Sequence, residues 1–229
     1  MKTALVTGAG RGIGLAAAHL FLRAGLRVLG LDKDLSKCDL PADARVPFDL
    51  QNLAEIPQLV KRLGDIDVLV NNAGTLYCHP HDAFPDAAAL EILTVNLLAP
   101  VALIQAVAPQ MRRRRSGRIV NVGSVAAFTG HPDLWYGASK AALLNVTKSY
   151  AAYLGADGVL VNAVAPGPTL SPMYDRLPES RKEAVMRSVH SGRPARPEEV
   201  AQVIVWLGTD SPEYVNGTTL DVNDGSYPR

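Results

Sequence analysis

A tyrosine and a lysine in the segment "WYGASK" (residues 135–140) are the side chains whose types and spacing could move a proton. Tyr136 and Lys140 are four positions apart, and residues at this spacing share one face of an α-helix. A free tyrosine has a pKa of ~10 and is a poor base at neutral pH, but a nearby cation such as Lys140 favours the phenolate. A coincidental surface pair has the same spacing, so the rest of the chain must decide between packing and acid–base chemistry.

A glycine-rich turn near the start of the chain predicts a nucleotide site. The segment "TGAGRGIG" (residues 7–14) has glycines at 8, 10, 12 and 14, follows the apolar run "TALVT" and leads into a helical pattern. Glycines let the backbone turn tightly and approach a phosphate, and the free N–H groups at a helix start favour negative charge. A plain strand-to-helix turn is the alternative, but the position between strand and helix favours a phosphate cradle.

Asp32 ends the second predicted strand, twenty residues after Gly12, where a carboxylate can accept hydrogen bonds from both hydroxyls of an adenosine ribose. It would also repel a 2′-phosphate by an energy on the order of a few kcal/mol. The prediction is therefore NAD rather than NADP. Arg11 and Lys33 oppose it, because either could lie near the ribose and neutralise a phosphate.

Asn96 lies within a helical pattern, and Pro100 follows four residues later. Proline has no N–H to donate, so the carbonyl of Asn96 must find another partner, such as ordered water, if the helix continues. We expect a kink in the helix at this point.

Short apolar runs alternate with longer helical patterns along the whole chain, which is typical of repeated βαβ units. We expect one domain (1–229) with an α/β, doubly wound (Rossmann) parallel sheet of seven strands and helices on both faces. The expected strands are "TALVT", "RVLGLD", "ARVPFD", "IDVLVN", "RIVNV", "GVLVNAV" and "TTLDV". The expected helices are 12–25, 53–64, 87–111, 136–155 and 197–208.

The alternation fails between Pro166 and Pro197, where proline, serine and charged residues surround one short helical pattern, "ESRKEAVMRSVH". A long irregular insertion in a compact domain is typically a lid or a binding segment. Ligands of doubly wound sheets lie beyond the carboxyl ends of the strands, so we expect residues 168–195 to cover a substrate.

Composition narrows the function classes. The formal charge of +1 provides no general attraction for nucleic acid or anionic lipid. Two cysteines, Cys38 and Cys78, are too few for a disulfide-stapled secreted domain. We find neither a signal peptide nor an uncharged apolar window of membrane-spanning length, and expect a cytoplasmic protein that binds neither membrane nor nucleic acid.

With these motifs in order, the chain resembles the short-chain dehydrogenase/reductase family over nearly its whole length. "TGAGRGIG" fits the family's TGxxxGxG loop, "NNAG" (71–74) the motif after the fourth strand, and "NAVAPG" (162–167) the segment beside nicotinamide. The resemblance implies a catalytic tetrad of Asn96, Ser124, Tyr136 and Lys140. It implies cofactor binding by Gly8, Arg11, Gly12, Ile13, Gly14, Asp32, Asp49, Leu50, Asn72, Ala73, Gly74, Tyr136, Lys140, Pro166, Gly167, Thr169 and Ser171.

The resemblance implies an oxidoreductase (EC 1.1.1.-) that transfers a hydride between a nicotinamide cofactor and an alcohol/ketone substrate. Tyr136 would be the general acid/base, Lys140 would lower its pKa and bind ribose, and Ser124 would orient the substrate. Asn96 would hold a water of a proton relay. NAD is the predicted cofactor, with NADP as the alternative. Relatives are commonly dimers or tetramers through helices 87–111 and 136–154, so a homo-oligomer, a homotetramer in particular, is expected.

Two other readings of the function stay open. One is an NADP-dependent 3-oxoacyl-acyl-carrier-protein reductase, whose acidic carrier could dock on "RRRR" (112–115); a solvated helix end is the alternative for that run. The other is a cofactor-binding sensor or scaffold without turnover, which the intact tetrad disfavours.

Three local features limit the assignment. Only eleven residues separate Ser124 from Tyr136, one fewer than in many relatives, which leaves the substrate unnamed. The family's carboxamide-binding threonine corresponds to Ser171, with Thr169 nearby, and the choice stays open. "YCHPHD" (77–82) lacks a second ligand cluster at zinc-site spacing, so no metal is predicted and a substrate-side loop is expected. His131 precedes the catalytic helix and could touch substrate.

Overall fold

The fold is built on one parallel sheet, shown in a computed structural model that describes residues 1–175 and 177–228. Within these residues the sheet has seven strands in the order β3-β2-β1-β4-β5-β6-β7, and every neighbouring pair is parallel. The strands are β1 (Thr3–Thr7), β2 (Arg27–Asp32), β3 (Arg45–Pro47), β4 (Val68–Asn71), β5 (Gly117–Val122), β6 (Val159–Pro166) and β7 (Thr219–Val222). The predicted doubly wound α/β sheet is confirmed.

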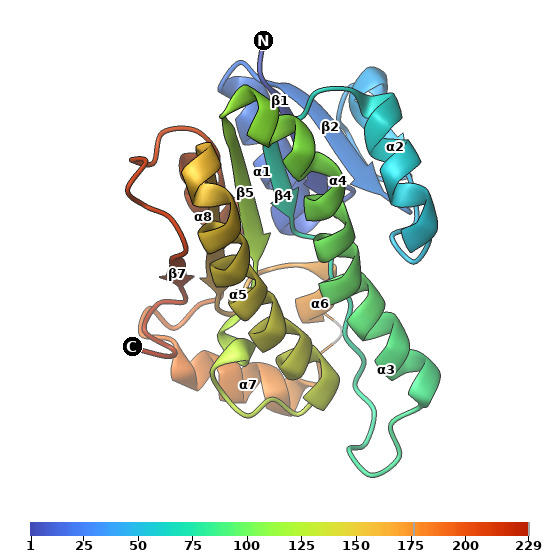
Figure 1. Cartoon of the computed structure of the whole chain (residues 1–229). Coiled ribbons are helices and arrows are strands. Elements are labelled where there is room, and N and C mark those ends of the chain that lie inside the picture. The colour runs from blue at the N-terminus through green and yellow to red at the C-terminus, as the bar shows by residue number, and fades with distance from the viewer. Residues whose placement is uncertain (176, 229) are drawn as a thin grey trace.

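Helices cover both faces of the sheet, as expected from its nearly continuous apolar strands. The helices α1 (Gly12–Arg23) and α8 (Pro197–Gly208) pack on one face through side chains such as Phe21 and Ile204. On the other face lie α2 (Ile56–Leu63), α4 (Ala99–Arg114) and α5 (Leu134–Leu154). In Figure 1, α4 and α5 run along the side of the sheet that faces the viewer. An apolar core therefore lies on each face of the sheet, and the two cores together hold the strands in place.

The expected long helix at 87–111 is three joined pieces. After α3 (Asp86–Leu93), residues Thr94–Leu98 form a π-helical turn in which the Ala99 N–H donates to the Thr94 carbonyl, and α4 continues from there. A π-helical turn holds one extra residue within a helix. The chain thus accommodates the missing N–H of Pro100 by widening one turn.

The segment after β6 contains α6 (Pro172–Asp175) and α7 (Glu179–Ser188), with a bridge between Thr169 and Ala195 at its base. Figure 1 shows both helices beyond the carboxyl ends of the strands. The expected irregular segment 168–195 therefore lies where a substrate cover must lie, and its short predicted helix is α7. Position 176 of that segment lies outside the described residues.

The prediction that the chain has no apolar window of membrane-spanning length was wrong. The joined helix Asp86–Arg114 has 29 residues and contains a window with a mean hydropathy of 2.0, which is long and apolar enough to cross a bilayer. In the structure, 39% of that window is buried inside the chain, mostly against the sheet. A core helix of a soluble protein passes the same test, so this helix is weak support for a membrane span.

Candidate active site

The site lies where the strand order reverses, between the carboxyl ends of β1 and β4. The Thr7 hydroxyl oxygen accepts hydrogen bonds from the backbone N–H groups of Asn72 and Ala73, both at 3.0 Å. The Asn72 side chain donates to the Thr7 carbonyl at 2.9 Å. These bonds hold the "NNAG" segment against the glycine-rich turn, at the switch point where ligands bind in open α/β sheets.

The glycine-rich turn fits a phosphate group. Gly8 and Gly12 have φ of 67° and 57°, a region that glycine adopts without strain. A Cβ on Gly8 would lie 2.8 Å from the Cα of Ala73, whereas a Cβ on Gly12 would meet nothing closer than the Cβ of Ser171 at 3.7 Å. The backbone at Gly12 is therefore open at the N-terminus of α1, where the helix dipole favours an anion.

Asp32 ends β2 beside this turn. Its carboxylate accepts hydrogen bonds from the backbone N–H groups of Gly10 at 2.9 Å and Asp34 at 3.1 Å. These bonds fix the carboxylate at the cavity wall, and Arg11 and Lys33 line the same cavity. Its remaining lone pairs suit the hydroxyls of a ribose, so the site fits a dinucleotide.

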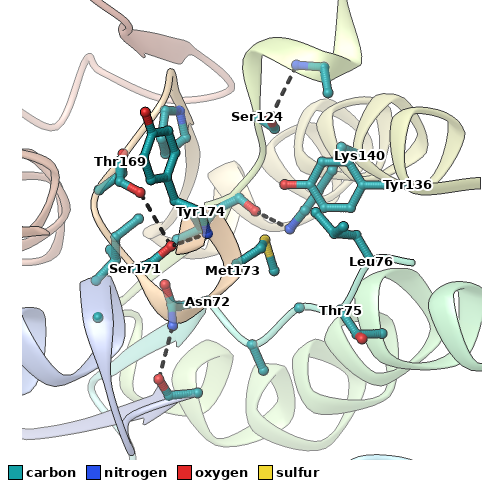
Figure 2. A pocket seen from close by; sticks show the side chains of 18 of the residues that line it. Asn72, Thr75, Leu76, Ser124, Tyr136, Lys140, Thr169, Ser171, Met173 and Tyr174 are labelled. Carbon is teal, nitrogen blue, oxygen red and sulfur yellow. Dashed lines mark hydrogen bonds between the residues drawn. The ribbon is translucent and has the colours of Figure 1, made fainter. Parts of the chain in front are cut away.

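A cavity of about 670 Å³ joins the turn to the substrate cover. In Figure 2, Ser124, Tyr136 and Lys140 lie on one side of it, and Thr169, Ser171 and Tyr174 lie opposite. The predicted residues that line it are Gly8, Arg11, Gly12, Ile13, Asp32, Asp49, Leu50, Asn72, Ala73, Gly74, Ser124, Tyr136, Lys140, Pro166, Gly167, Thr169 and Ser171.

Two predicted residues lie behind the cavity wall. A Cβ on Gly14 would clash with the Gly8 carbonyl and the Asn72 amide, so Gly14 permits close packing of helix and turn. Asn96 is fully buried. Its amide oxygen accepts from the Thr75 N–H at 2.8 Å, and its amide nitrogen donates to the Thr75 carbonyl and the Ser139 hydroxyl. Asn96 therefore fixes the loop after β4 to α5.

Tyr136 projects its hydroxyl into the cavity from the first turn of α5 (Figure 2). Burial raises its pKa above the ordinary value, a hydrogen bond with Ser124 lowers it in part, and the charge of Asp133 raises it further. In the protein chain by itself, burial therefore decides the direction of the shift, which is opposite to the lowering expected from Lys140. A buried tyrosine of this kind keeps its proton at neutral pH.

Lys140 lies one turn along α5, and its Nζ is 5.8 Å from the centroid of the Tyr136 ring. The ammonium donates to the Val122 carbonyl at 2.8 Å. Burial lowers the pKa of Lys140 from 10.5 to about 8. At pH 7 it remains charged, beside the tyrosine and at the cavity wall.

Ser124 follows β5 and begins a 3₁₀ turn, where its hydroxyl oxygen accepts from the Ala126 N–H at 3.1 Å. This bond fixes the hydroxyl at the cavity wall, which Tyr136 also lines. The side chain has no base that would make it a nucleophile. Its geometry suits orientation of a substrate oxygen.

Asp133 is a residue of the site that the sequence analysis missed. Its Oδ1 accepts from the Tyr136 N–H at 2.9 Å and caps α5, while its Oδ2 accepts from the Tyr77 N–H at 2.8 Å. An aspartate just before a helical pattern is an N-cap signal, so the cap could have been predicted. The bond to Tyr77 depends on tertiary structure and could not.

The two candidates for a carboxamide contact both line the cavity. The Thr169 hydroxyl donates to the Gly167 carbonyl at 3.1 Å, and the Ser171 hydroxyl donates to the Thr169 carbonyl at 3.2 Å while accepting from the Tyr174 N–H. Ser171 also faces Gly12 across the turn. Each residue presents a fixed hydroxyl, and the two stay alternatives.

Of the loop "YCHPHD", Tyr77 lines the cavity, whereas residues 78–82 and the run "RRRR" do not. His81 and Asp82 are 3.7 Å apart, and within the described residues no three His, Cys, Asp or Glu side chains group as metal ligands. Arg112 pairs with Asp157 at 2.6 Å and Arg114 with Asp65 at 2.8 Å. Since the run ends just before β5 begins, it lies at the amino edge of the sheet, opposite the cavity (Figure 1).

Comparison with known proteins agrees with this site. The family model described as short chain dehydrogenase matches residues 2–182. The 3-oxoacyl-acyl-carrier-protein reductase FabG of Thermotoga maritima is 37% identical, with 98% of this chain and 97% of that protein covered. The reductase of the same name from Vibrio cholerae is 34% identical, with coverage of 99% and 97%.

Solved structures agree as well. A protein from Beutenbergia cavernae, provisionally described as an NAD(P)-dependent gluconate 5-dehydrogenase with NADP bound at low occupancy, has a TM-score of 0.90 and 34% identity, with coverage of 98% and 96%. An Agrobacterium tumefaciens protein provisionally described as a 2-deoxy-D-gluconate 3-dehydrogenase with bound NADP has a TM-score of 0.92 and 29% identity, with coverage of 100% and 97%. The chain belongs to the short chain dehydrogenase family, as its motifs predicted, and is an NAD(P)-dependent oxidoreductase.

Proposed function

We propose that this enzyme transfers a hydride between NAD and an alcohol/ketone substrate, with Tyr136 as the general acid/base. One observation carries the proposal: the Tyr136 hydroxyl projects into the cavity that the glycine-rich turn and Ser124 also line (Figure 2). When bound, the nicotinamide ring donates or accepts the hydride. The chain must then hold the substrate oxygen and move one proton.

The residues divide this work. The turn at Gly8 and Gly12 would hold the pyrophosphate, and Asp32 the adenosine ribose, with Asp49 and Leu50 beside adenine. Lys140 would bind the second ribose, and either Thr169 or Ser171 the carboxamide. Ser124 would position the substrate oxygen for Tyr136.

The raised pKa of Tyr136 determines how we expect the rate in each direction to depend on pH. At neutral pH the hydroxyl holds a proton that it can donate to a carbonyl oxygen, whereas alcohol oxidation needs the phenolate. We therefore expect ketone reduction to proceed at pH 7 and alcohol oxidation to gain rate as the pH rises. A relay through Lys140 and a water at the Asn96 carbonyl would return the proton to Tyr136.

The Tyr136→Phe variant tests the proposal. Phenylalanine keeps the ring but removes the proton, so kcat for ketone reduction should fall by about 10²- to 10⁴-fold. The measurement is nicotinamide absorbance with a panel of ketones and alcohols, and NADH binding measured by fluorescence should stay within a few-fold of wild type. Retained turnover in this variant would contradict the role of Tyr136.

The preference for NAD rests on Asp32, whose fixed carboxylate would repel a 2′-phosphate. We predict a higher kcat/KM with NADH than with NADPH. Arg11 and Lys33 at the cavity wall, and the NADP bound to both structural relatives, favour the opposite preference. Steady-state kinetics with NADH and with NADPH test this prediction. A clearly higher kcat/KM with NADPH would overturn the assignment of NAD as the cofactor.

A second candidate is 3-oxoacyl-acyl-carrier-protein reduction, which the identity to two such reductases favours. "RRRR" is a poor docking surface for the carrier, because it lies at the sheet edge opposite the cavity and Arg112 and Arg114 pair within the chain. Charge reversal at Arg113 and Arg115 should therefore leave any activity on carrier-bound substrate unchanged. A large loss would assign the run to docking.

We propose that the enzyme is a cytoplasmic homo-oligomer, a dimer or tetramer paired through α4 and α5, acting on a small-molecule substrate. Cell fractionation tests the location.

The alternative of a cofactor-binding sensor or scaffold predicts no turnover. The absence of hydride transfer with every alcohol and carbonyl of a broad panel would favour that alternative.

A further inference from the structure

Arg181 is a cation at the substrate side of the cavity, and no acidic side chain among the described residues pairs with it. It lies on α7 and lines the cavity, and its Nη2 is 2.9 Å from the Nε2 of His131. Two other cations of the substrate cover are paired: Lys182 with Glu179 at 2.7 Å, and Arg193 with Glu199 at 2.8 Å. Arg187 on α7 is not among the residues that line the cavity. In the part of the chain that the structure describes, no carboxylate forms an ion pair with Arg181.

His131 holds this guanidinium without neutralising it. A guanidinium can only donate, so a hydrogen bond with Arg181 requires the Nε2 of His131 to accept. The ring proton then lies on Nδ1 and is donated to the Asp133 carbonyl oxygen at 3.0 Å, in place of the Asp133 N–H contact to the same Nδ1 at 3.1 Å. Burial and the charge of Arg181 both lower the pKa of His131 below its ordinary value. The imidazole is therefore neutral at pH 7, and the full positive charge of Arg181 remains.

His131 also determines where Arg181 lies relative to the Tyr136 hydroxyl. The ring centroids of His131 and Tyr136 are 5.1 Å apart, so one imidazole ring separates the guanidinium from the catalytic tyrosine. A short substrate with its carbonyl at Tyr136 could reach Arg181 with its other end.

The surroundings of Arg181 favour a singly charged anion. The acids that line the cavity are Asp32 and Asp49, at the ends of β2 and β3, and Glu91, which accepts from the Tyr77 hydroxyl at 2.8 Å. The walls near α6 and α7 include Met173, Leu177 and Val185. A partly buried cation among apolar side chains is costly without an anion, and the guanidinium fork matches a carboxylate in two hydrogen bonds.

We propose that Arg181 binds a carboxylate of the substrate, so that the alcohol/ketone pair is a hydroxy acid and its oxo acid. A carboxylate fits better than a phosphate dianion because Arg181 is the one cation that the cover contributes to the described lining. Lys140 donates to the Val122 carbonyl beside Tyr136, and Arg11 and Lys33 lie beside the glycine-rich turn and β2. The inference rests on the proposed function, since it places the carbonyl at Tyr136.

Matched pairs of acid and ester test the inference. The probes are acetoacetate, 4-oxopentanoate and 5-oxohexanoate, each beside its methyl ester, in reduction with the preferred cofactor. At the chain length that spans Tyr136 and Arg181, the acid should exceed its ester in kcat/KM by about 10-fold or more, because a charge-assisted bidentate bond is lost in the ester.

Substitution of Arg181 then isolates the charge. Arg181→Met should lower kcat/KM for that acid by about 10- to 100-fold, mainly through KM, while the ester changes far less and the KM of the cofactor stays constant. Lys182→Met is the matched control, because this neighbouring cation is already paired with Glu179, and it should leave the ratio of acid to ester unchanged. An unchanged ratio in Arg181→Met, or esters equal to acids at every chain length, would overturn the inference.

A binding measurement separates this inference from the proposed function. Calorimetric titration of Tyr136→Phe with NADH and each of the three acids should show saturable binding that the double variant with Arg181→Met loses. If Tyr136→Phe binds the acids but has no turnover, both the carboxylate site at Arg181 and the role of Tyr136 are supported. Ester reduction that depends on Tyr136, without any binding of the acids, would remove the carboxylate site and leave the proposed function intact.

Discussion

Burial acts on both members of the Tyr136 and Lys140 pair, and it favours the neutral form of each. The pKa of the tyrosine is raised, and that of the lysine is lowered to about 8. The lysine reaches the Val122 carbonyl, and no described hydrogen bond joins it to the phenol. In the chain alone, Tyr136 is therefore protonated and can donate its proton. Lys140 is a buried cation whose desolvation lowers the stability of the folded state.

That cost predicts a stability effect of Lys140→Met. Because the pKa of Lys140 is lower in the folded than in the unfolded state, the unfolded state binds more protons between pH 8 and 10.5, and stability rises with pH in that window. Below pH 8 the full cost is present, about 3 kcal/mol for a shift of this size. Methionine removes it but leaves the Val122 carbonyl without its donor, at about 1 kcal/mol.

We therefore expect Lys140→Met to be inactive yet more stable than wild type by about 1 to 2 kcal/mol at pH 7. Urea unfolding at pH 7 and at pH 10 measures this difference, which should shrink at the higher pH. A variant that is less stable at pH 7, or a difference independent of pH, would show that the buried ammonium costs little.

Residue types and spacings could predict the catalytic positions but not their electrostatics. Asn96, Ser124, Tyr136 and Lys140 stand in motifs that are continuous in sequence. The direction of a pKa shift depends on burial, which arises from contacts between distant segments, so the raised pKa of Tyr136 in the chain alone could not be read from its motif. Arg181 and His131 are 50 residues apart, and nothing in either segment indicates that they meet.

At the scale of single elements, the π-helical turn Thr94–Leu98 connects a missing backbone donor to the site. Pro100 cannot donate to the Asn96 carbonyl, and the turn is one residue wider than an α-helical turn. The side chain of Asn96 is occupied by Thr75 and Ser139. In the proposed mechanism, its carbonyl would hold the relay water.

Pro100→Ala tests this relay. Alanine supplies an N–H that can donate to the Asn96 carbonyl in the α-helical pattern, which would compete with the water, so kcat should fall by about 10-fold. Pro109→Ala is the matched control, because Pro109 lies inside the same helix α4, two and a half turns further on. Steady-state kcat and thermal melting of both variants give the answer; an undiminished kcat in Pro100→Ala would argue against the carbonyl as part of the proton path.

The other element that decides function is the substrate cover. Its proline and serine content predicted an irregular segment with one helix, and the structure contains that helix as α7. Which side chain α7 turns toward the cavity depends on the bonds at its base, including Thr169 with Ala195 and His190 with Asp224. These pairings are not encoded by local periodicity, so the sequence could place the cover without identifying Arg181.

At the scale of the whole molecule, the topology explains why dispersed motifs form one site. All strands are parallel, so their carboxyl ends lie at one edge, and the loops that carry Gly12, Asn72, Ser124 and Gly167 meet there. Alternating strands and helices predict this arrangement, because βαβ crossovers are almost always right-handed. The strand order itself depends on how helices pack on both faces of the sheet. The two apolar cores are the result of that packing.

The outer faces of α3, α4 and α5 lack such a packing partner within the described chain. Leu90 and Leu98 are 63% and 43% exposed, and Tyr153 on α5 is 71% exposed. Leu90 lies on α3, which Figure 1 shows extending beyond the sheet in line with α4. Leu98 lies in the π-helical turn, and Tyr153 lies on α5, which packs on one face of the sheet. Apolar residues on helices that already pack one face against a core favour contact with a second subunit.

We accordingly predict that the 24.4 kDa chain sediments as a dimer or tetramer, and that Leu90→Glu combined with Tyr153→Glu shifts it toward the monomer. The charges would have to be desolvated in an apolar interface, which costs several kcal/mol per subunit contact. Arg62→Glu, an equally exposed charge change on α2, should leave the assembly intact. Sedimentation velocity over a concentration series measures all three proteins. A monomeric wild type would disprove the assembly, whereas a double variant of unchanged mass would place the interface elsewhere, because two buried carboxylates in each subunit could not be accommodated between α3 and α5 of neighbouring chains.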